Sequence, residues 1–283
     1  MAIFTNQATL SYSGNTVNSN IVTGNLVEVL AVTKTAVGDT YSPGDRITYV
    51  VSITNSGTTP FVGLTVTDNL GAYTFGETTL TPLDYVDGSV LYYQNGILQS
   101  SPVPTDNNPL TFTGITVPAG GNTTLIYETE ANSFAPLTPE SAITNEVTIT
   151  GGGLSVSVSD TETVIITEEP VLSITKSLSP VNVTENSELT YTFTIQNTGN
   201  APADATDNIV ITDTFDPILS GISVTVNGVV LPPTSYTYDE ATGEFATVSG
   251  AITVPAATFT QDPDTGNWLI TPGVTTVTVT GTV

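Results

Sequence analysis

Residues 47–57 read ITYVVSITNSG, and residues 189–199 read LTYTFTIQNTG. The same interval separates a second pair of segments, LAVTKT at residues 30–35 and LSITKS at residues 172–177. Self-similarity at a fixed long interval is the signature of repeated structural units. Within each segment apolar and polar residues alternate, which indicates β-strands with one buried face. The chain is therefore predicted to contain two copies of one β-rich unit.

The remaining composition agrees with a fold made of strands. A third pair, LTVTD at residues 64–68 and IVITD at residues 209–213, extends the repeat. Thr, Val, Ile and Tyr dominate between turn residues, and no convincing amphipathic helix is present. The 283 residues suffice for two sandwich domains. We predict an all-β fold with an N-terminal arm at residues 1–26 and two tandem Ig-like antiparallel β-sandwich domains at residues 27–167 and 168–283.

One strand of the repeat is displaced along the chain. ITNEVTI at residues 143–149 follows the first unit and should close its sheet, whereas no counterpart follows the second unit before Val283. The matching segment is FTNQATL at residues 4–10. A sandwich without its last strand exposes an apolar groove and unpaired strand edges. We expect the second domain to lack its last strand, and the arm to supply that strand to a neighbouring copy of the chain.

The predicted donor strand has one mainly apolar face. Its alternate residues share that face: Phe4, Asn6, Ala8, Leu10 and Tyr12. Strand addition between copies is a heterologous contact that does not close, so it would give a head-to-tail homopolymer. The alternative is that residues 1–26 form a loose arm with no partner and that the chain is cut short at Val283.

Three polar residues in each unit share the parity of the buried face. They are Lys34, Asp68 and Asn145 in the first unit, and Lys176, Asp213 and the Asn6 of another copy in the second. Burial would favour a neutral amine and a neutral acid, which is the state needed for a Lys amine to attack an Asn amide and form an isopeptide bond. The Asp would assist each self-modification. The alternative is a buried Lys–Asp ion pair that the Asn side chain satisfies by hydrogen bonds.

The charge and the missing residue types exclude several function classes. The chain has 27 acidic and three basic residues, which disfavours binding to nucleic acid or to anionic membrane surfaces. It has no Cys and no His, so disulfides, thiol nucleophiles and imidazole catalysis are excluded. The acids are scattered among turns, which makes a polysaccharide-processing enzyme a weak alternative. We expect no enzyme, no cofactor, no metal site and no membrane insertion.

The quoted segments resemble the bacterial surface-protein repeats catalogued as domain of unknown function eleven. That resemblance implies an Ig-like sandwich in a cell-envelope or appendage protein. The Lys/Asp/Asn arrangement is similar to the isopeptide-bearing domains of Gram-positive pilins and adhesins, which implies the cross-linking roles given above. Members usually carry an export signal and often a wall anchor, and this chain shows neither recognisably. By analogy, this leaves room for assembly inside a mother cell, as for spore appendages.

The expected function is a structural subunit of an extracellular, pilus-like filament on a cell or spore surface. The alternative is a surface adhesin or carbohydrate-binding module, in which Tyr92 and Tyr93 would be candidates for stacking on sugar rings. DPDTGN at residues 262–267 resembles a calcium loop, but its Pro and Gly placement favours a hairpin turn. Trp268, the only Trp, is expected in the core of the second domain.

Overall fold

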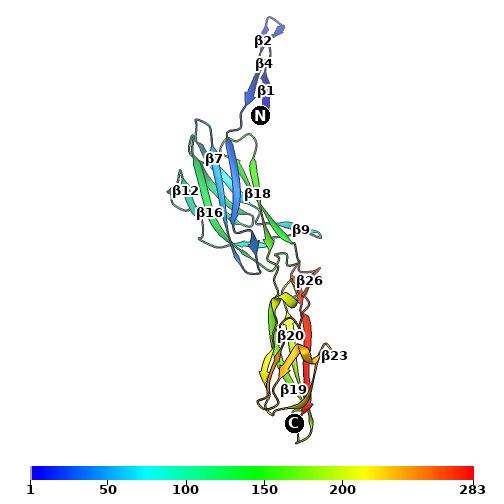
Figure 1. The fold of residues 1–283 in the computed structure, drawn as a ribbon. Helices are drawn as coiled ribbons and strands as arrows, with labels where there is room; N and C mark the ends of the chain where they lie inside the picture. Colours follow the sequence, from blue (N-terminus) through cyan, green and yellow to red (C-terminus); the bar gives the residue numbers. More distant parts are fainter. Residues whose placement is uncertain (1) are drawn as a thin grey trace.

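The chain forms two β-sandwiches and a projecting arm. The computed structural model describes residues 2–283, without the side chains of residues 2 and 26; Met1, the first residue of the predicted arm, lies outside the described residues. Figure 1 shows the arm at one end of an elongated molecule and the C-terminus at the other. The described residues contain no α-helix, only two short 3-10 turns, η1 (Ala205–Asp207) and η2 (Pro233–Ser235). The predicted all-β fold is confirmed.

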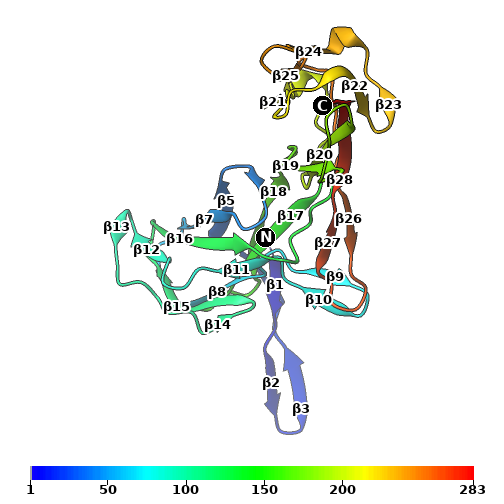
Figure 2. The ribbon, with the colours of Figure 1, turned by 90° about the horizontal axis from the view of Figure 1, so that it is seen from below.

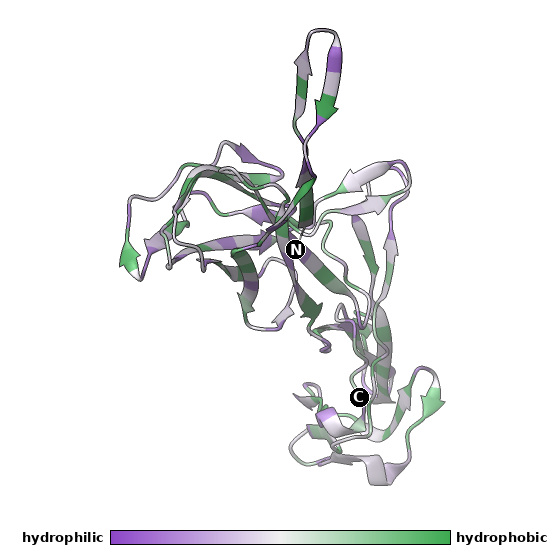
Figure 3. Cartoon of the chain, turned by 90° about the horizontal axis from the view of Figure 1, so that it is seen from above, coloured by the Kyte–Doolittle hydropathy of each residue, from purple (hydrophilic) through white to green (hydrophobic). Residues whose placement is uncertain are grey.

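The arm is a hairpin rather than a single strand. It consists of β1 (Ala2–Asn6), β2 (Thr9–Tyr12), β3 (Asn15–Asn18) and β4 (Val22–Leu26). β1 pairs with β4 and β2 with β3, both antiparallel, and the tip is a two-residue turn at Ser13 and Gly14. Both turn residues have positive φ, 43° and 83°, as the twist of a tight hairpin requires. Figure 3 shows apolar positions on both strands of this hairpin.

The first sandwich packs two six-stranded sheets face to face. One sheet contains, in order, β13 (Ile97–Leu98), β12 (Leu91–Gln94), β16 (Asn122–Ala131), β7 (Arg46–Asn55) and β5 (Leu30–Val37), with β11 (Leu83–Tyr85) also on β16. The other contains β14 (Asp106–Asn107), β15 (Leu110–Val117), β8 (Phe61–Asp68), β17 (Ala142–Gly151), β18 (Val158–Ile166) and β6 (Thr40–Tyr41). A separate hairpin of β9 (Tyr73–Phe75) and β10 (Thr78–Leu80) lies at the edge.

Strand alternation builds the first core. Along β7 every second side chain is buried, and the buried set is Ile47, Tyr49, Val51 and Ile53. The facing strands β8, β15 and β17 bury Leu64, Phe112 and Ile149 against them. Each such side chain contributes roughly 1.5–3 kcal/mol by leaving water.

The second sandwich has a complete sheet and a short one. The complete sheet runs β19 (Leu172–Ser179), β20 (Glu188–Asn197), β28 (Gly273–Thr282), β22 (Ser220–Val226) and β23 (Val229–Val230). The short sheet runs β21 (Thr212–Thr214), β25 (Glu244–Thr247) and β24 (Tyr236–Tyr238). A separate core forms here, with Phe193, Phe215 and Val279 among its buried members. The predicted domain boundary at residues 167 and 168 stays a prediction.

The two sandwiches differ at one edge. In the first, β8 pairs with β15 on one side and β17 on the other, and β18 continues the sheet beyond β17. In the second, β21 pairs with β25 alone among the described residues. All eight residues of β19 are exposed, whereas β5, its counterpart, buries Leu30 and Lys34. The position that β17 and β18 fill in the first sandwich is open in the second.

A hairpin from the second repeat packs on the first sandwich. It consists of β26 (Thr258–Gln261) and β27 (Trp268–Thr271), and Figure 2 shows it beside β9 and β10. Trp268 packs against the first core, so its predicted place in the second core is wrong. The hairpin is inserted just before β28 and extends back across the junction, where the Gln261 amide donates to the Tyr73 hydroxyl at 2.7 Å.

Candidate cross-linking sites

The predicted trio of the first unit meets inside the first sandwich. Lys34 lies on β5, Asp68 ends β8 and Asn145 lies on β17, so three strands from both sheets contribute. Each of the three residues is at most 2% exposed. The alternation that buries Leu30 on β5 and Leu64 on β8 turns these polar side chains inward as well.

Asp68 is the centre of the first site. The Lys34 Nζ lies 2.5 Å from Asp68 Oδ2, and the Tyr127 hydroxyl donates a hydrogen bond to the same oxygen. Asp68 Oδ1 accepts from the backbone N–H of Leu70 at 2.8 Å. The ammonium also lies 4.6 Å from the centre of the Tyr49 ring. These contacts hold the amine and the acid of the trio in fixed positions.

The Asn145 amide has no regular partner. Among the described residues, neither its nitrogen nor its oxygen makes a hydrogen bond of regular geometry, although the side chain is fully buried. A buried polar group left without a hydrogen bond costs about 1–3 kcal/mol. The alternative expected from the sequence, an ion pair that Asn satisfies by hydrogen bonds, would have occupied these atoms.

Burial shifts the protonation of the first site. It lowers the pKa of Lys34 below the usual 10.5, and the negative charges of Asp68, Glu162 and Asp160 act in the opposite direction. Burial raises the pKa of Tyr127 well above its ordinary value, and the charge of Asp68 adds to that effect. Tyr127 therefore stays protonated as a donor to Asp68. A lowered Lys34 pKa increases the fraction of neutral amine, the form that can act as a nucleophile.

The second site is assembled only in part. Lys176 on β19 forms an ion pair with Asp213 on β21, and their side chains are 39% and 17% exposed. The Lys176 Nζ lies 4.4 Å from the centre of the Tyr191 ring. Among the described residues, no Asn side chain donates a hydrogen bond to Asp213 Oδ2. Asn6 lies on the exposed arm at the opposite end of the molecule (Figure 1).

An open groove leads to the second pair. It lies between β19 and β21 and has a volume of about 370 Å³. Its lining combines the ion pair with apolar side chains, which include Ile174, Phe193 and Ile211. In the first sandwich the corresponding space is filled by β17 and β18.

The predicted donor residues are uncovered. Phe4, Asn6, Ala8, Leu10 and Tyr12 are all exposed on the arm. Cross-strand pairing sets Asn6 opposite Val22 and Leu10 opposite Val17. The arm touches neither groove nor core of its own chain among the described residues, and both of its strands present an apolar face.

Two features of the sites were not predicted. Tyr127 has no equivalent in the second sandwich, because Tyr49 pairs with Tyr127 but its counterpart Tyr191 pairs with Val279. Comparison of the two repeats therefore gave no signal for it. The second strand of the arm was also not predicted. Its signal in the sequence is weak, because Val17 and Val22 are apolar residues within a mostly polar segment.

Other candidates turn out to be structural. Asp262 accepts from the backbone N–H groups of Asp264 and Thr265, as in a hairpin turn, and these bonds lower its pKa. No group of three or more acidic side chains within residues 2–283 could hold a metal ion. Tyr92 is buried and Tyr93 is half-buried, so they do not form an exposed pair for a sugar ring. None of the helical turns in residues 2–283 is long and apolar enough to cross a membrane.

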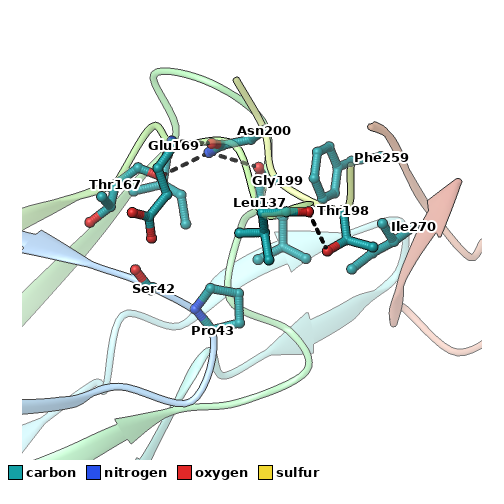
Figure 4. Close-up of a pocket in the computed structure, with 12 residues that line it drawn as sticks. Ser42, Pro43, Leu137, Thr167, Glu169, Thr198, Gly199, Asn200, Phe259 and Ile270 are labelled. Carbon is teal, nitrogen blue, oxygen red and sulfur yellow. Dashed lines mark hydrogen bonds between the residues drawn. The ribbon is translucent and has the colours of Figure 1, made fainter. Parts of the chain in front are cut away.

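A pocket marks the junction between the sandwiches. It has a volume of about 330 Å³, and Figure 4 shows Leu137, Phe259 and Asn200 among its lining residues. The Asn200 amide donates to the carbonyl of Thr167 at 3.1 Å, and its oxygen accepts from the N–H of Glu169 at 3.1 Å. The pocket therefore belongs to the joint between the two sandwiches.

Comparison with known proteins assigns the chain to no family. No model of a known protein family matches the chain, and no curated protein matches it significantly. A collagen adhesin from S. aureus is similar at a TM-score of 0.32 and 14% identity, over 56% of this chain and 55% of the adhesin, so the match spans about half of that protein's length. The sporulation control protein Spo0M of Bacillus subtilis gives 0.30 and 10%, over 60% of this chain and 74% of that one. Scores this low carry no argument about function, and the resemblance to the surface-protein repeats stays a prediction.

Proposed function

We propose that this chain is the subunit of an extracellular, pilus-like filament on a cell or spore surface, in which the arm of each copy completes the second sandwich of its neighbour. One observation carries the proposal. An open groove that holds Lys176 and Asp213 lies in one sandwich, and an uncovered hairpin that carries Asn6 lies at the other end of the chain.

The first sandwich supplies the register for the proposed contact. There, β17 pairs with β8 so that Val147 lies opposite Asp68 and Ile149 opposite Val66. If Asn6 occupies the place of Asn145, the same pairing extends along the donated strand. The resulting pairs are Ala8 with Asp213, Leu10 with Ile211 and Tyr12 with Ile209. Main-chain hydrogen bonds would supply affinity, and alternate side chains would fix the register.

The proposed contact propagates. It joins two different surfaces, so the copy that donates its arm keeps its own groove open for the next copy. Because the arm and the groove lie at opposite ends of the molecule, we expect addition to continue instead of closing within one chain (Figure 1). The partner of the chain is therefore another copy of itself.

The proposed covalent step turns each docked strand into a permanent link. The neutral amine of Lys176 attacks Cγ of Asn6, a new C–N amide bond forms, and the bond from Cγ to Nδ2 breaks. Asp213 carries the proton that Nζ loses to the departing nitrogen, which leaves as ammonia. Within one copy, Lys34 and Asn145 would react in the same way with Asp68 as the proton carrier.

The geometry of the first site supports this chemistry. Holding the reacting groups together is worth on the order of 7–11 kcal/mol relative to free reactants. The buried Asn145 amide, which makes no hydrogen bond of regular geometry, and the lowered Lys34 pKa both favour reaction over a simple ion pair. Each site would react once and would not turn over, so the proposed role is structural and not enzymatic.

Electron microscopy and denaturing gels test the proposal. Purified chain should form long threads in negative stain, and boiling in detergent should leave a ladder of covalent multimers. Asn6→Ala should keep threads but remove the ladder. Asn25→Ala is the matched control, because Asn25 pairs with Ile3 on the other face of the arm. A monodisperse monomer at high concentration would overturn the proposal and favour the adhesin or carbohydrate-binding alternative.

A further inference from the structure

The first sandwich closes its open edge with two strands, not one. β17 pairs with β8, and β18 pairs with β17 from Val158 to Ile165. β18 then seals the seam to β5, where the carboxylate of Asp160 accepts from the backbone N–H of Lys34 at 2.7 Å. Val158 and Val164, both on β18, pack on the first core. A single added strand at the place of β17 would leave the gap next to β5, which β18 fills, uncovered.

Within residues 168–283, the second sandwich has no counterpart of either strand. Among the described residues nothing covers the inward side of β19, where Leu172, Ile174 and Leu178 remain exposed next to Lys176. Their counterpart strand β5 is covered by β18 in the first sandwich. One donated strand beside β21 would pair the edge of that sheet, but it would leave β19 in contact with water.

We propose, as an extension that rests on the proposed function, that the arm is donated as a complete hairpin: β1 and β2 take the place of β17, and β3 and β4 take the place of β18 over β19 of the neighbouring copy. The occupant is thus residues 2–26 of a second copy of this chain. The arguments are the register of the hairpin, the composition of its faces and its charge.

The register of the arm matches that of the β17–β18 pair. In the first sandwich Ile149 lies opposite Val158 and Asn145 opposite Glu162. In the arm, Leu10 lies opposite Val17 and Asn6 opposite Val22. Superposing Asn6 on Asn145 therefore puts Val17 at the place of Val158 and Val22 at the place of Glu162. One extra residue in the arm, in the bend between β3 and β4, forms a local bulge.

Both strands of the arm present the same apolar face. Residues directly opposite each other in a hairpin have their side chains on one side of it. Val17 and Val22 therefore share the face of Leu10 and Asn6, and they are 51% and 56% exposed. A single-strand donor would need this face on β1 and β2 only. An apolar face two strands wide matches the place that two strands, β17 and β18, occupy in the first sandwich.

Charge separates the arm from the rest of the chain. Residues 1–27 contain no charged side chain, although the chain as a whole has a formal net charge of −24. The β17–β18 pair carries Glu146, Asp160 and Glu162, whereas Ser19 and Val22 stand at the places of the last two. A neutral hairpin can dock on a strongly acidic neighbour without adding like charge to the contact.

Single cysteines test the proposal, because the chain has none of its own. The variants are Leu10→Cys on the first strand, Val17→Cys on the second, and Thr16→Cys, which pairs with Ser11 on the outward face. Each thiol is reacted with iodoacetamide before and after assembly. We expect Leu10→Cys and Val17→Cys to react at least ~10-fold more slowly in filaments than in the monomer, since reaction then requires local opening. Thr16→Cys should react equally in both.

The outcomes separate the two proposals. If Leu10→Cys is protected while Val17→Cys reacts as fast as Thr16→Cys, only one strand is donated; the hairpin proposal is then overturned and the filament proposal stands. If the chain assembles with Leu10→Cys unprotected, or does not assemble at all, the proposed function itself falls. Each substitution replaces an exposed side chain, so the fold of the sandwiches is not at risk.

Discussion

Replacing Asn145 by Ala distinguishes a covalent link from an ion pair in the first sandwich. The change leaves the Lys34–Asp68 contact and the Tyr127 hydrogen bond in place. A bond between residues 34 and 145 would close a loop of roughly 110 residues. Such a cross-link lowers the conformational entropy of the unfolded chain and so raises the free energy of unfolding by about 5 kcal/mol. Without the bond, the substitution removes an amide that has no regular hydrogen bond, so its cost is that of a small cavity, about 1 kcal/mol.

The assay combines urea unfolding with intact mass. If the link forms, the wild-type mass is lower than that of the sequence by one ammonia for the internal site, and Asn145→Ala restores the full mass and lowers the free energy of unfolding by about 5 kcal/mol. Asn55→Ala is the control: this buried Asn donates to the carbonyls of Thr59 and Pro118, so it should destabilise without any change in the mass loss. A wild-type mass equal to the sequence, with Asn145→Ala within about 1 kcal/mol of wild type, would refute the reasoning.

Three further outcomes follow from the same structure. Tyr127→Phe removes the hydroxyl that donates to Asp68, and it should slow the first cross-link by about 10-fold or more, as loss of one positioned donor does. The second cross-link should be unaffected, because Val279 stands at the place of Tyr127 there. Time-resolved mass spectrometry of the refolding chain measures both rates. The rate of the first cross-link should rise with pH as the amine deprotonates and level off below pH 10.5, because burial lowers the pKa of Lys34; a rate still rising above that pH contradicts the lowered value. Trp268 packs on the first core, so its fluorescence emission should report unfolding of the first sandwich. Phe193→Ala lowers the stability of the second sandwich by about 3–5 kcal/mol, because Phe193 is buried in the second core. The substitution should shift the circular-dichroism transition of the second sandwich and leave the midpoint of the Trp268 fluorescence transition unchanged.

The strand pattern of the sequence is a good guide where one face of a strand is buried. Alternation placed Lys34, Asp68 and Asn145 on inward faces, and the structure has all three there. The same parity argument gave the apolar face of the arm's first strand. These features were predictable because a strand's side-chain period is fixed, so burial of one residue determines its neighbours.

Features that depend on non-repeated residues were not predictable in this way. Trp268 lies in an insertion, and alternation alone does not tell which of two sandwiches a hairpin covers. Tyr127 lies opposite Tyr49 across the strand pair, and the second repeat has Val279 at the corresponding position opposite Tyr191, so the repeat does not reveal the contact with Asp68. The second strand of the arm matches β18 at few positions, such as Val17 at the place of Val158, because the acidic residues Asp160 and Glu162 of β18 are replaced by Ser19 and Val22.

The β26–β27 hairpin has a mechanical consequence for the proposed filament. Within one chain it braces the junction, since Trp268 and Gln261 reach across to the first sandwich. The first sandwich has no such insertion, because β15 and β16 are joined by a short turn at residues 118–121. The junction between successive copies would therefore be unbraced. Such a thread would bend at every second joint, with its curvature concentrated where one molecule meets the next.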